Sequence, residues 1–267
     1  MAEHRARKRF GQHFLVDQGV LGGIVQAIGP RPGDAMVEIG PGLGALTRVV
    51  LPHVERLHAV EIDRDLAARL RHISQADKLV VYEADALAFD FAQLPKPLRI
   101  IGNLPYNISS PLLFHLAEHL DHVQDQHFML QKEVVDRLAA TPGSKDFGRL
   151  TVMLGACYDI EWLFDVPPEA FEPPPRVMSA IVRMTPIPAA RRTLLYPAVF
   201  RRLVAGAFSQ RRKMLRNTLA ELVSESQAHA VGIDLTWRAE NVSTAQYIAL
   251  ANSLGGSSNN HREGSNA

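Results

Sequence analysis

Apolar residues follow two different spacings along the chain, and these spacings predict its elements. From residue 30 onward, short β-branched apolar runs alternate with segments whose apolar positions recur every three or four residues. This alternation is typical of βαβ units around a mostly parallel sheet. The expected strands are 35–39, 57–62, 79–82, 98–101, 126–130, 160–166 and 179–184. The expected helices are 45–54, 65–73, and three that begin near Ser110, Lys132 and Leu150.

The pattern changes after Pro186 and Pro188, which interrupt any regular element. Beyond them apolar residues recur at helical spacing, at positions 200, 203, 204, 207 and 208, then at 215, 219 and 222, and again at 247, 248 and 250. The last residues are rich in Gly, Ser and Asn, a composition typical of disorder. We therefore expect an α/β domain over residues 1–187, a helical domain over 188–254 and a disordered tail over 255–267.

Composition places the chain among ordinary globular proteins, with 46% hydrophobic and 21% charged residues over 267 positions. No apolar run approaches the roughly 18 to 20 residues that span a bilayer, and Asp17 interrupts the segment after the basic start. We expect a cytoplasmic protein with no membrane partner. The single cysteine, Cys157, excludes an internal disulfide and a multi-cysteine metal site, and it fits a packed core thiol better than a nucleophile.

Charge is distributed unevenly, although the formal net charge is only +1. Residues 1–9 carry a net +3 and residues 10–172 a net −9, whereas residues 173–220 hold ten Arg or Lys and no acid. Segregation on this scale points to an anionic macromolecule as the partner of the basic segments. The alternative is a set of solvated helix faces, but ten bases without one acid exceed what solubility needs.

A glycine-rich turn, EIGPGLG at 38–44, joins the first expected strand to its helix. Glycines such as Gly40 and Gly42 let the backbone bend tightly and approach a ligand closely. The segment also fits a dinucleotide-binding G-x-G-x-x-A pattern, with Glu61 at a suitable spacing to hold a ribose. Because that motif alone is weak, an NAD-dependent dehydrogenase and a tight turn without a ligand both stay open at this point.

Polar side chains follow three successive expected strands: Glu61, Asp85 and Asn103. Ligands of open α/β sheets collect at the carboxyl ends of strands, so we expect these three side chains to face one crevice. The Glu61 carboxylate can accept from both hydroxyls of a ribose, and Asp85 can accept from the amine of a purine. A lone surface acid at Glu61 and a helix cap at Asp85 are the alternatives. Together the three predict a pocket for an adenosine moiety.

The tetrapeptide Asn103-Leu104-Pro105-Tyr106 supplies hydrogen-bond acceptors and an aromatic plane at one turn. The Asn103 carboxamide oxygen and a main-chain carbonyl beside Pro105 can both accept from one amino group, while Tyr106 stacks on the base that carries it. Such bonds localise the nitrogen lone pair, so the amine becomes a nucleophile without a strong general base. A structural turn with a half-buried tyrosine is the alternative.

Several motifs together resemble those of the ribosomal RNA adenine dimethyltransferases. They are KRFGQHFL (8–15), EIGPGLG (38–44), EID (61–63), DA (85–86), NLPYNISSP (103–111), FEPPPRVMSAIVRM (171–184) and FSQRRKMLRNTL (208–219). The resemblance spans about residues 8–254, and QHFL, Leu104 and QRRK look more like the small-subunit (16S) enzymes than the large-subunit antibiotic-resistance methylases. Arg176 and Met214 stand where the family pattern has Lys and Thr, and neither touches the inferred chemistry.

The resemblance implies a class I (Rossmann-like) S-adenosylmethionine-dependent methyltransferase domain, followed by a small helical RNA-binding domain. It implies that His13 and Leu15 close over the cofactor and that Gly40 approaches its methionine end. Glu61 would bind the ribose and Asp85 the adenine. The full implied cofactor set is His13, Leu15, Gly40, Gly42, Glu61, Asp85 and Asn103. The scattered histidines suggest no metal site.

The same resemblance implies a target adenine that lies out of its stack between Tyr106 and Phe171. A core aromatic is the alternative for Phe171. The catalytic residues implied are Asn103, Leu104, Pro105, Tyr106 and Phe171. The RNA-binding residues expected are Arg211, Arg212, Lys213 and Arg216.

The implied activity is dimethylation of two adjacent adenosines near the 3′ end of 16S rRNA during biogenesis of the small ribosomal subunit. A monomer would act on the rRNA or on the pre-30S particle. A large-subunit rRNA methylase and a mainly non-catalytic rRNA-binding assembly factor stay open as alternatives. A dehydrogenase gives no reason for the NLPY turn or the basic helices, and an assembly factor should have lost the cofactor groups.

Overall fold

The computed structural model describes residues 13–263, with side chains described as far as residue 256. The basic segment 1–9 and the last four residues of the expected tail lie outside this range. The described chain forms two compact units, one of residues 13–135 and 160–186 and one of residues 136–159 and 187–263. Each unit has a hydrophobic core of its own.

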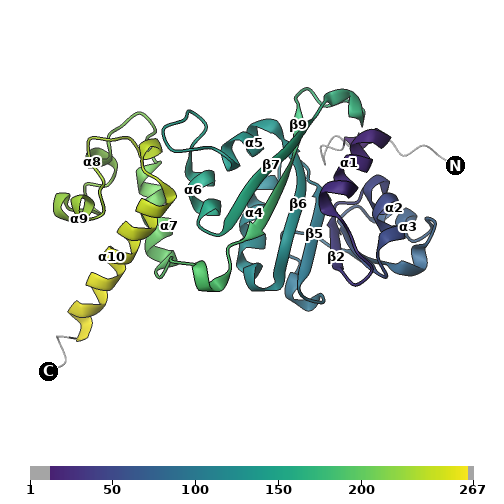
Figure 1. Cartoon of the computed structure of the whole chain (residues 1–267), viewed down its shortest axis with the longest axis horizontal. Helices are drawn as coiled ribbons and strands as arrows, with labels where there is room; N and C mark the ends of the chain where they lie inside the picture. The colour runs from purple at the N-terminus through teal and green to yellow at the C-terminus, as the bar shows by residue number, and fades with distance from the viewer. Residues whose placement is uncertain (1–12, 264–267) are drawn as a thin grey trace. The chain divides into compact units, whose positions relative to one another are not determined.

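The first unit is built on a seven-stranded sheet with the order β4-β3-β2-β5-β6-β9-β7 (Figure 1). The strands are β2 (Ala35–Ile39), β3 (Leu57–Glu61), β4 (Leu79–Glu83), β5 (Leu98–Asn103), β6 (Val123–Gln131), β7 (Tyr158–Val166) and β9 (Ser179–Pro186). The five neighbours β4-β3-β2-β5-β6 pair in parallel, and β9 pairs antiparallel with β6. The α/β fold class expected from the sequence is confirmed, and β2 has the expected bounds.

Four helices follow expected strands, with bounds set by local chemistry, and the last of them ends past the boundary of the first unit at residue 135. They are α2 (Ala45–Val50), α3 (Arg64–Leu70), α4 (Ser109–Leu116) and α5 (Lys132–Leu138). Helix α2 is shorter than the expected 45–54 and passes into a 3₁₀ turn that contains Pro52, which has no N–H to donate. Helix α3 begins at Arg64 because the Asp63 side chain accepts from two backbone N–H groups of its first turn.

Helix α1 (Gln18–Ile28) is absent from the elements expected from the sequence. Asp17 caps it by accepting from the Val20 N–H at 2.9 Å, and Gly29 ends it in the left-handed region with φ of 56°. Its buried stripe consists of Leu21, Ile24 and Ile28. This cap, this spacing and this terminal glycine are all visible in the sequence and could have identified the helix.

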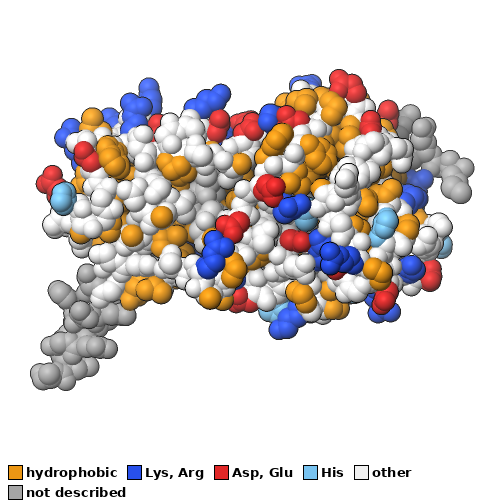
Figure 2. Space-filling view, viewed as in Figure 1, with side chains coloured by type: hydrophobic (Ala, Val, Ile, Leu, Met, Phe, Trp, Pro, Cys, Tyr) orange, Lys and Arg blue, Asp and Glu red, His pale blue; other side chains and the backbone are white. Residues whose placement is uncertain are grey.

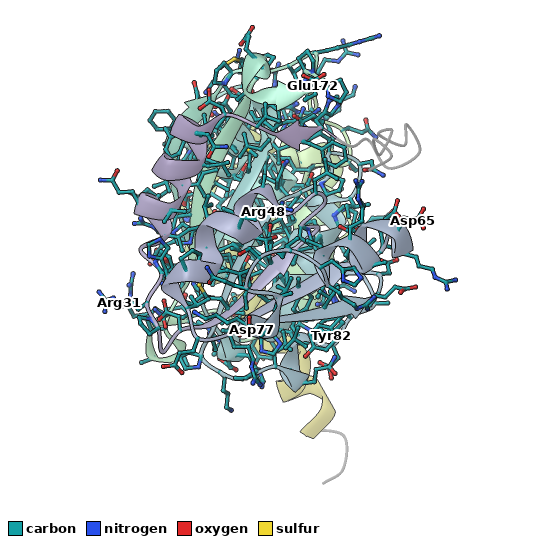
Figure 3. The ribbon with its side chains drawn as sticks, turned by 90° about the vertical axis from the view of Figure 1, so that its right-hand side faces the viewer. Arg31, Arg48, Asp65, Asp77, Tyr82 and Glu172 are labelled. Atoms are coloured by element: carbon teal, nitrogen blue, oxygen red, sulfur yellow. The ribbon has the colours of Figure 1, made fainter. Side chains whose placement is uncertain are left out.

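A second, two-stranded sheet joins β1 (Phe14–Leu15) to β8 (Phe171–Glu172). The pairing is antiparallel and sets Leu15 opposite Phe171. Figure 3 shows β1 beside the labelled Glu172, with α1 continuing from it. The pairing attaches the segment before α1 to the first unit, although Leu15 and its partner Phe171 are 156 residues apart in the sequence.

The second unit is helical: α6 (Arg149–Gly155), α7 (Pro197–Ala207), α8 (Leu215–Thr218), α9 (Glu225–Ala230) and α10 (Thr244–Glu263). Helix α10 lies beside α7 (Figure 1). Phe147 and Val152 are buried in the same core as Phe200 and Leu203. Residues 136–159 therefore pack with the helices, although the sequence led us to place them in the 1–187 domain.

Helix α10 continues past Gly255, where the composition led us to expect the start of a disordered tail. Gly255 is a packing position, because a Cβ atom there would lie 2.2 Å from the Tyr196 ring. The Asn252 side chain also donates to the Thr193 carbonyl and accepts from the Leu195 N–H, so this part of α10 is fastened to the segment before α7. Neither α10 nor any other helix among the described residues is long and apolar enough to cross a membrane.

Candidate active site

A cavity of about 340 Å³ lies at the carboxyl edge of the parallel strands. Residues at or just after the ends of β2, β3, β4 and β5 line it together: Gly40, Glu61, Asp85 and Asn103. Leu15 lines it from β1, His13 from the position just before β1, and Ile24 from α1. Most of the side chains expected from the sequence to form a small-molecule site thus meet at one place.

The glycine turn depends on backbone conformations that side chains disfavour. Gly40, Gly42 and Gly44 have φ values of 65°, 59° and 79°. A Cβ atom on Gly42 would also come within 3.3 Å of the Phe14 ring. The turn therefore brings bare backbone to the cavity wall, as the sequence predicted.

Glu61 ends β3 with its carboxylate fixed at both oxygens. Oε2 accepts from the Gly42 N–H at 3.0 Å and Oε1 from the Asp63 N–H at 2.9 Å. Burial raises the pKa of this carboxyl, while the two backbone donors act in the opposite direction. Each oxygen keeps a second lone pair, so the oriented group can accept from a pair of neighbouring hydroxyls.

Glu38 is a site residue that the sequence analysis did not single out. It lies in β2, is 2% exposed and lines the cavity. Its Oε2 accepts from the Thr47 hydroxyl at 2.6 Å. Burial raises the pKa of Glu38 to about 7. The Thr47 hydrogen bond lowers this pKa, and the charge of the nearby Glu61 raises it further. An acid inside an otherwise apolar buried strand was the signal in the sequence.

Asp85 and Ile62 lie at the more open side of the cavity. Asp85 Oδ1 accepts from the Leu87 N–H at 2.9 Å within a turn, and Asp85 lines the cavity wall. No helix follows it directly, so the helix cap considered from the sequence is not formed. Ile62 is 52% exposed and also lines the cavity, which suits it to pack on a flat ligand. Among the described side chains, no group of three or more His, Cys, Asp or Glu is placed to hold a metal ion.

Asn103 ends β5 with a defined orientation of its carboxamide. Its Nδ2 donates to the His13 carbonyl at 3.2 Å. Because a carbonyl can only accept, the amide nitrogen must face His13. The amide oxygen Oδ1 is therefore free to act as an acceptor toward the cavity. The contact joins residues 90 positions apart in the sequence.

The following turn positions Leu104, Pro105 and Tyr106. Leu104 is buried and its N–H donates to the Met129 carbonyl at 3.1 Å. The Pro105 carbonyl accepts from the Ile108 N–H at 3.1 Å, which closes the turn before α4. This bond engages one of the two carbonyls beside the proline.

The Tyr106 ring is half-buried and held at its hydroxyl. A hydrogen bond of 2.9 Å joins this hydroxyl to that of Ser179, a fully buried residue at the start of β9. Burial raises the pKa of the Tyr106 phenol, so the group stays protonated at neutral pH. The His13 ring stacks toward it, with centroids 6.0 Å apart and planes at 25°. His13 Nδ1 also lies 2.8 Å from the Pro173 carbonyl.

Phe171 is placed differently from the sequence expectation. It belongs to β8, is 3% exposed and packs in the hydrophobic core with Leu15 and Leu21. It is not among the residues that line the cavity. The ring that faces Tyr106 in this structure is that of His13, because pairing of β8 with β1 directs Phe171 into the core.

The ribosomal RNA adenine dimethylase family matches this chain over residues 3–255. The chain belongs to this family. The ribosomal RNA small subunit methyltransferase A of Bordetella bronchiseptica is 59% identical over 254 residues, which covers 95% of this chain and 96% of the relative. The protein of the same name from Leptothrix cholodnii is 60% identical, and the match covers 93% of this chain and 91% of the relative.

Solved structures of related enzymes share the fold of this adenine dimethylase. A dimethyladenosine transferase from Plasmodium falciparum superposes with a TM-score of 0.78 at 26% identity, covering 91% of this chain and 98% of that one. The 23S rRNA methyltransferase ErmE superposes with a TM-score of 0.70 at 26% identity, covering 91% and 99%. Both cover the helical region as well as the sheet.

The basic residues expected to bind RNA lie in the second unit of the dimethylase. Arg211, Arg212 and Lys213 precede α8, and Arg216 lies within it; all four are exposed. Arg211 Nη2 donates to the carbonyl of Lys145 at 2.7 Å, which brings the loop before α6 beside them. In Figure 2, several Lys and Arg side chains lie along the upper margin of the part of the view that holds the helices of this unit, with acidic side chains among them.

Proposed function

We propose that this chain uses S-adenosylmethionine to dimethylate the exocyclic amines of two adjacent adenosines near the 3′ end of small-subunit (16S) rRNA. The observation that carries the proposal is the Asn103–Tyr106 turn, which lies in the same cavity as Glu61 and Asp85. One wall thus offers acceptors for a nucleoside cofactor and the other offers an acceptor and a ring for a target base. Close relatives at 59% identity that are named small-subunit methyltransferases support the choice of subunit.

The cofactor residues act through groups whose orientation is already set. Glu61 accepts from the ribose hydroxyls, Asp85 from the adenine amine, and Ile62 packs on the adenine. Gly40 and Gly42 let the main chain approach the methionine end. Leu15 in β1 and His13 just before it cover the cofactor. When bound, the cofactor supplies an electrophilic methyl group on a sulfonium sulfur.

Alignment of the target amine supplies much of the proposed rate. The amine donates one hydrogen to Asn103 Oδ1 and the other to the Leu104 carbonyl, since the Pro105 carbonyl already serves the turn. Both bonds keep the nitrogen lone pair directed at the methyl carbon. The new N–C bond would form as the methyl carbon–sulfur bond breaks, and the electron pair of that bond would stay on sulfur as a neutral thioether. The methylated amine would then be a cation that is acidic enough to lose its proton to water. No side chain has to remove a proton beforehand.

Base stacking in this proposal rests on Tyr106. The adenine leaves its helix stack and lies against the Tyr106 ring, a contact worth about 1–3 kcal/mol. The Ser179 hydrogen bond keeps that ring in place. Because Phe171 is buried in the core, we assign it the support of Leu15 rather than a direct stack on the base.

Methyl transfer to defined particles tests the proposed function directly. Undermethylated small subunits, large subunits and naked rRNA are incubated with radiolabelled S-adenosylmethionine, and the nucleosides are analysed. We expect label in small subunits, recovered as dimethyladenosine. Label confined to large subunits would assign the chain to the large-subunit methylases. Tight rRNA binding without any transfer would assign it to the assembly factors.

Replacement of Arg211, Arg212 and Lys213 by Ala should weaken binding to the rRNA substrate. Each lost phosphate contact reduces the slope of log affinity against log salt by up to about one. The measurement is a salt titration of rRNA affinity. The matched control replaces Arg31, Arg56 and Lys96, three exposed bases that precede strands of the sheet in the first unit, and should keep the slope. Equal slopes in both triple variants and the parent would remove the assigned role.

A further inference from the structure

The end of helix α1 is held by two arginines that come from the sheet. The helix carries no basic residue in its own last turn. Arg99 Nη2 in β5 donates to the Ile28 carbonyl at 2.6 Å, and Arg183 Nη2 in β9 donates to the Ala27 carbonyl at 3.1 Å. The last carbonyls of a helix lack partners within it and carry a partial negative charge, so cations are favourable there.

Arg99 is itself fixed on every side of its guanidinium. Nη1 pairs with Asp34 Oδ2 at 2.6 Å, and Nη2 and Nε both reach the Asp125 carboxylate at 2.9–3.1 Å. The residue is only 6% exposed. A buried ionic group of this kind is weak evidence for stability, because replacing the whole group by apolar residues is often neutral, whereas removing one partner leaves the remaining charges buried and unpaired. Its fork geometry does set the position of what it binds.

Arg183 is held in a similar way. Its Nε donates to His127 Nε2 at 3.1 Å and its Nη1 to Glu161 Oε2 at 3.1 Å. The first bond requires His127 Nε2 to carry no proton. Burial lowers the pKa of His127 to about 4. The Asp125 charge opposes this shift, whereas the Arg183 and Arg99 charges add to it. The imidazole is therefore neutral near pH 7 and can accept.

The other end of α1 leads into the cavity. Residues His13 and Leu15 of the preceding segment line it, and Ile24 lines it from the helix itself. Figure 3 shows α1 running from β1, near Glu172, toward Arg31 at the far edge of the sheet. The helix thus connects the cofactor-covering wall to the two arginines.

We propose that Arg99 and Arg183 are positioning residues that hold α1, and through it β1, as the wall over the cofactor. The inference rests on the proposed function, since it takes the occupant of the cavity to be S-adenosylmethionine. Loss of either arginine leaves the catalytic groups in place but loosens the wall. The expected signature is weaker cofactor binding with a preserved chemical step.

Calorimetry with S-adenosylmethionine on the full-length chain tests the positioning role of the two arginines. Arg99→Met and Arg183→Met should each raise the cofactor Kd about tenfold or more, in line with the strength of a cation at a partly buried helix end. The KM for the cofactor should rise equally while kcat stays within about threefold. Arg99→Lys, which keeps the charge without the fork, should fall between the parent and Arg99→Met.

A readout without ligand separates positioning from general destabilisation. Amide hydrogen exchange over residues 18–28 should speed up in Arg99→Met and Arg183→Met. The control Leu94→Ala removes a buried contact of the same unit outside the cavity, and should leave this exchange and the cofactor Kd unchanged. In a double-mutant cycle, the effects of Arg99→Met and Ile24→Ala on cofactor affinity should be less than additive.

Two results would overturn the inference, and they differ from failure of the proposed function. An unchanged cofactor Kd in Arg99→Lys, Arg99→Met and Arg183→Met would remove the positioning role while the parent still binds S-adenosylmethionine. An equal rise in Kd for Leu94→Ala would make the effect one of stability alone. A parent protein that does not bind S-adenosylmethionine would instead remove the proposed function and, with it, the inference.

Discussion

Replacing Asn103 by Ala should lower single-turnover methylation on the order of 100-fold, by analogy with the loss of a preorganised polar contact. The carboxamide is oriented by its bond to the His13 carbonyl, and its oxygen is the acceptor that the target amine meets. Ala removes this acceptor but leaves the Glu61 and Asp85 groups that bind the nucleoside part of the cofactor. Cofactor affinity should therefore change much less than the rate. The measurement is rapid-quench transfer at saturating cofactor and substrate.

The matched control is Gln93→Ala, which removes an exposed carboxamide of the same unit outside the cavity. Its transfer rate should stay within about twofold of the parent. A rate for Asn103→Ala that is also close to the parent would exclude Asn103 as the acceptor of the amine. A large loss of cofactor affinity would assign it instead to cofactor binding.

Replacing Glu38 by Gln should stabilise the cofactor-free protein at pH 8 by up to about 3 kcal/mol, from 1.4 kcal/mol per pKa unit. Burial raises the pKa of this carboxyl from 4.5 to about 7. The folded state therefore prefers the protonated form, and its free energy of unfolding falls as the pH rises from 4.5 to about 7, then levels off. Gln has no charge to bury and keeps an acceptor for the Thr47 hydroxyl. Denaturant unfolding from pH 5 to 8 measures the difference.

The same substitution should weaken cofactor binding about tenfold at pH 8, the equivalent of about one pKa unit. An ionised Glu38 attracts a cationic ligand in the cavity, so affinity of the parent should rise as the pH passes through 7. Thr47→Val is the control: it removes the hydrogen bond that lowers the Glu38 pKa in the folded state, and should extend the falling part of the stability curve to higher pH. Parallel stability curves for the parent and Glu38→Gln would show that burial does not raise this pKa.

Local sequence was sufficient for the central strands and for the polar groups at their ends. Strands β2 to β5 are short β-branched runs between turn residues, a signal that needs no distant partner. Because parallel strands present their carboxyl ends at one edge, the positions of Glu61, Asp85 and Asn103 in the chain already predicted a shared cavity. The glycine turn was also predictable from local sequence, because backbone positions with φ above zero favour Gly.

Only the tertiary structure decided how these groups are oriented and which segments cover them. The Asn103 carboxamide is oriented by His13, 90 residues away, and the end of α1 is held by Arg183, 156 residues away from Ala27. Phe171 lies in the core, where β8 pairs with β1. Residues 136–159 pack with the helices because Phe147 and Val152 are buried in the helical core. Contacts of this range depend on which faces meet after folding, and neither hydrophobic period nor turn chemistry specifies them. The amino-acid sequence determined which chemistry the cavity contains, and the folded chain determined how its groups are oriented and held.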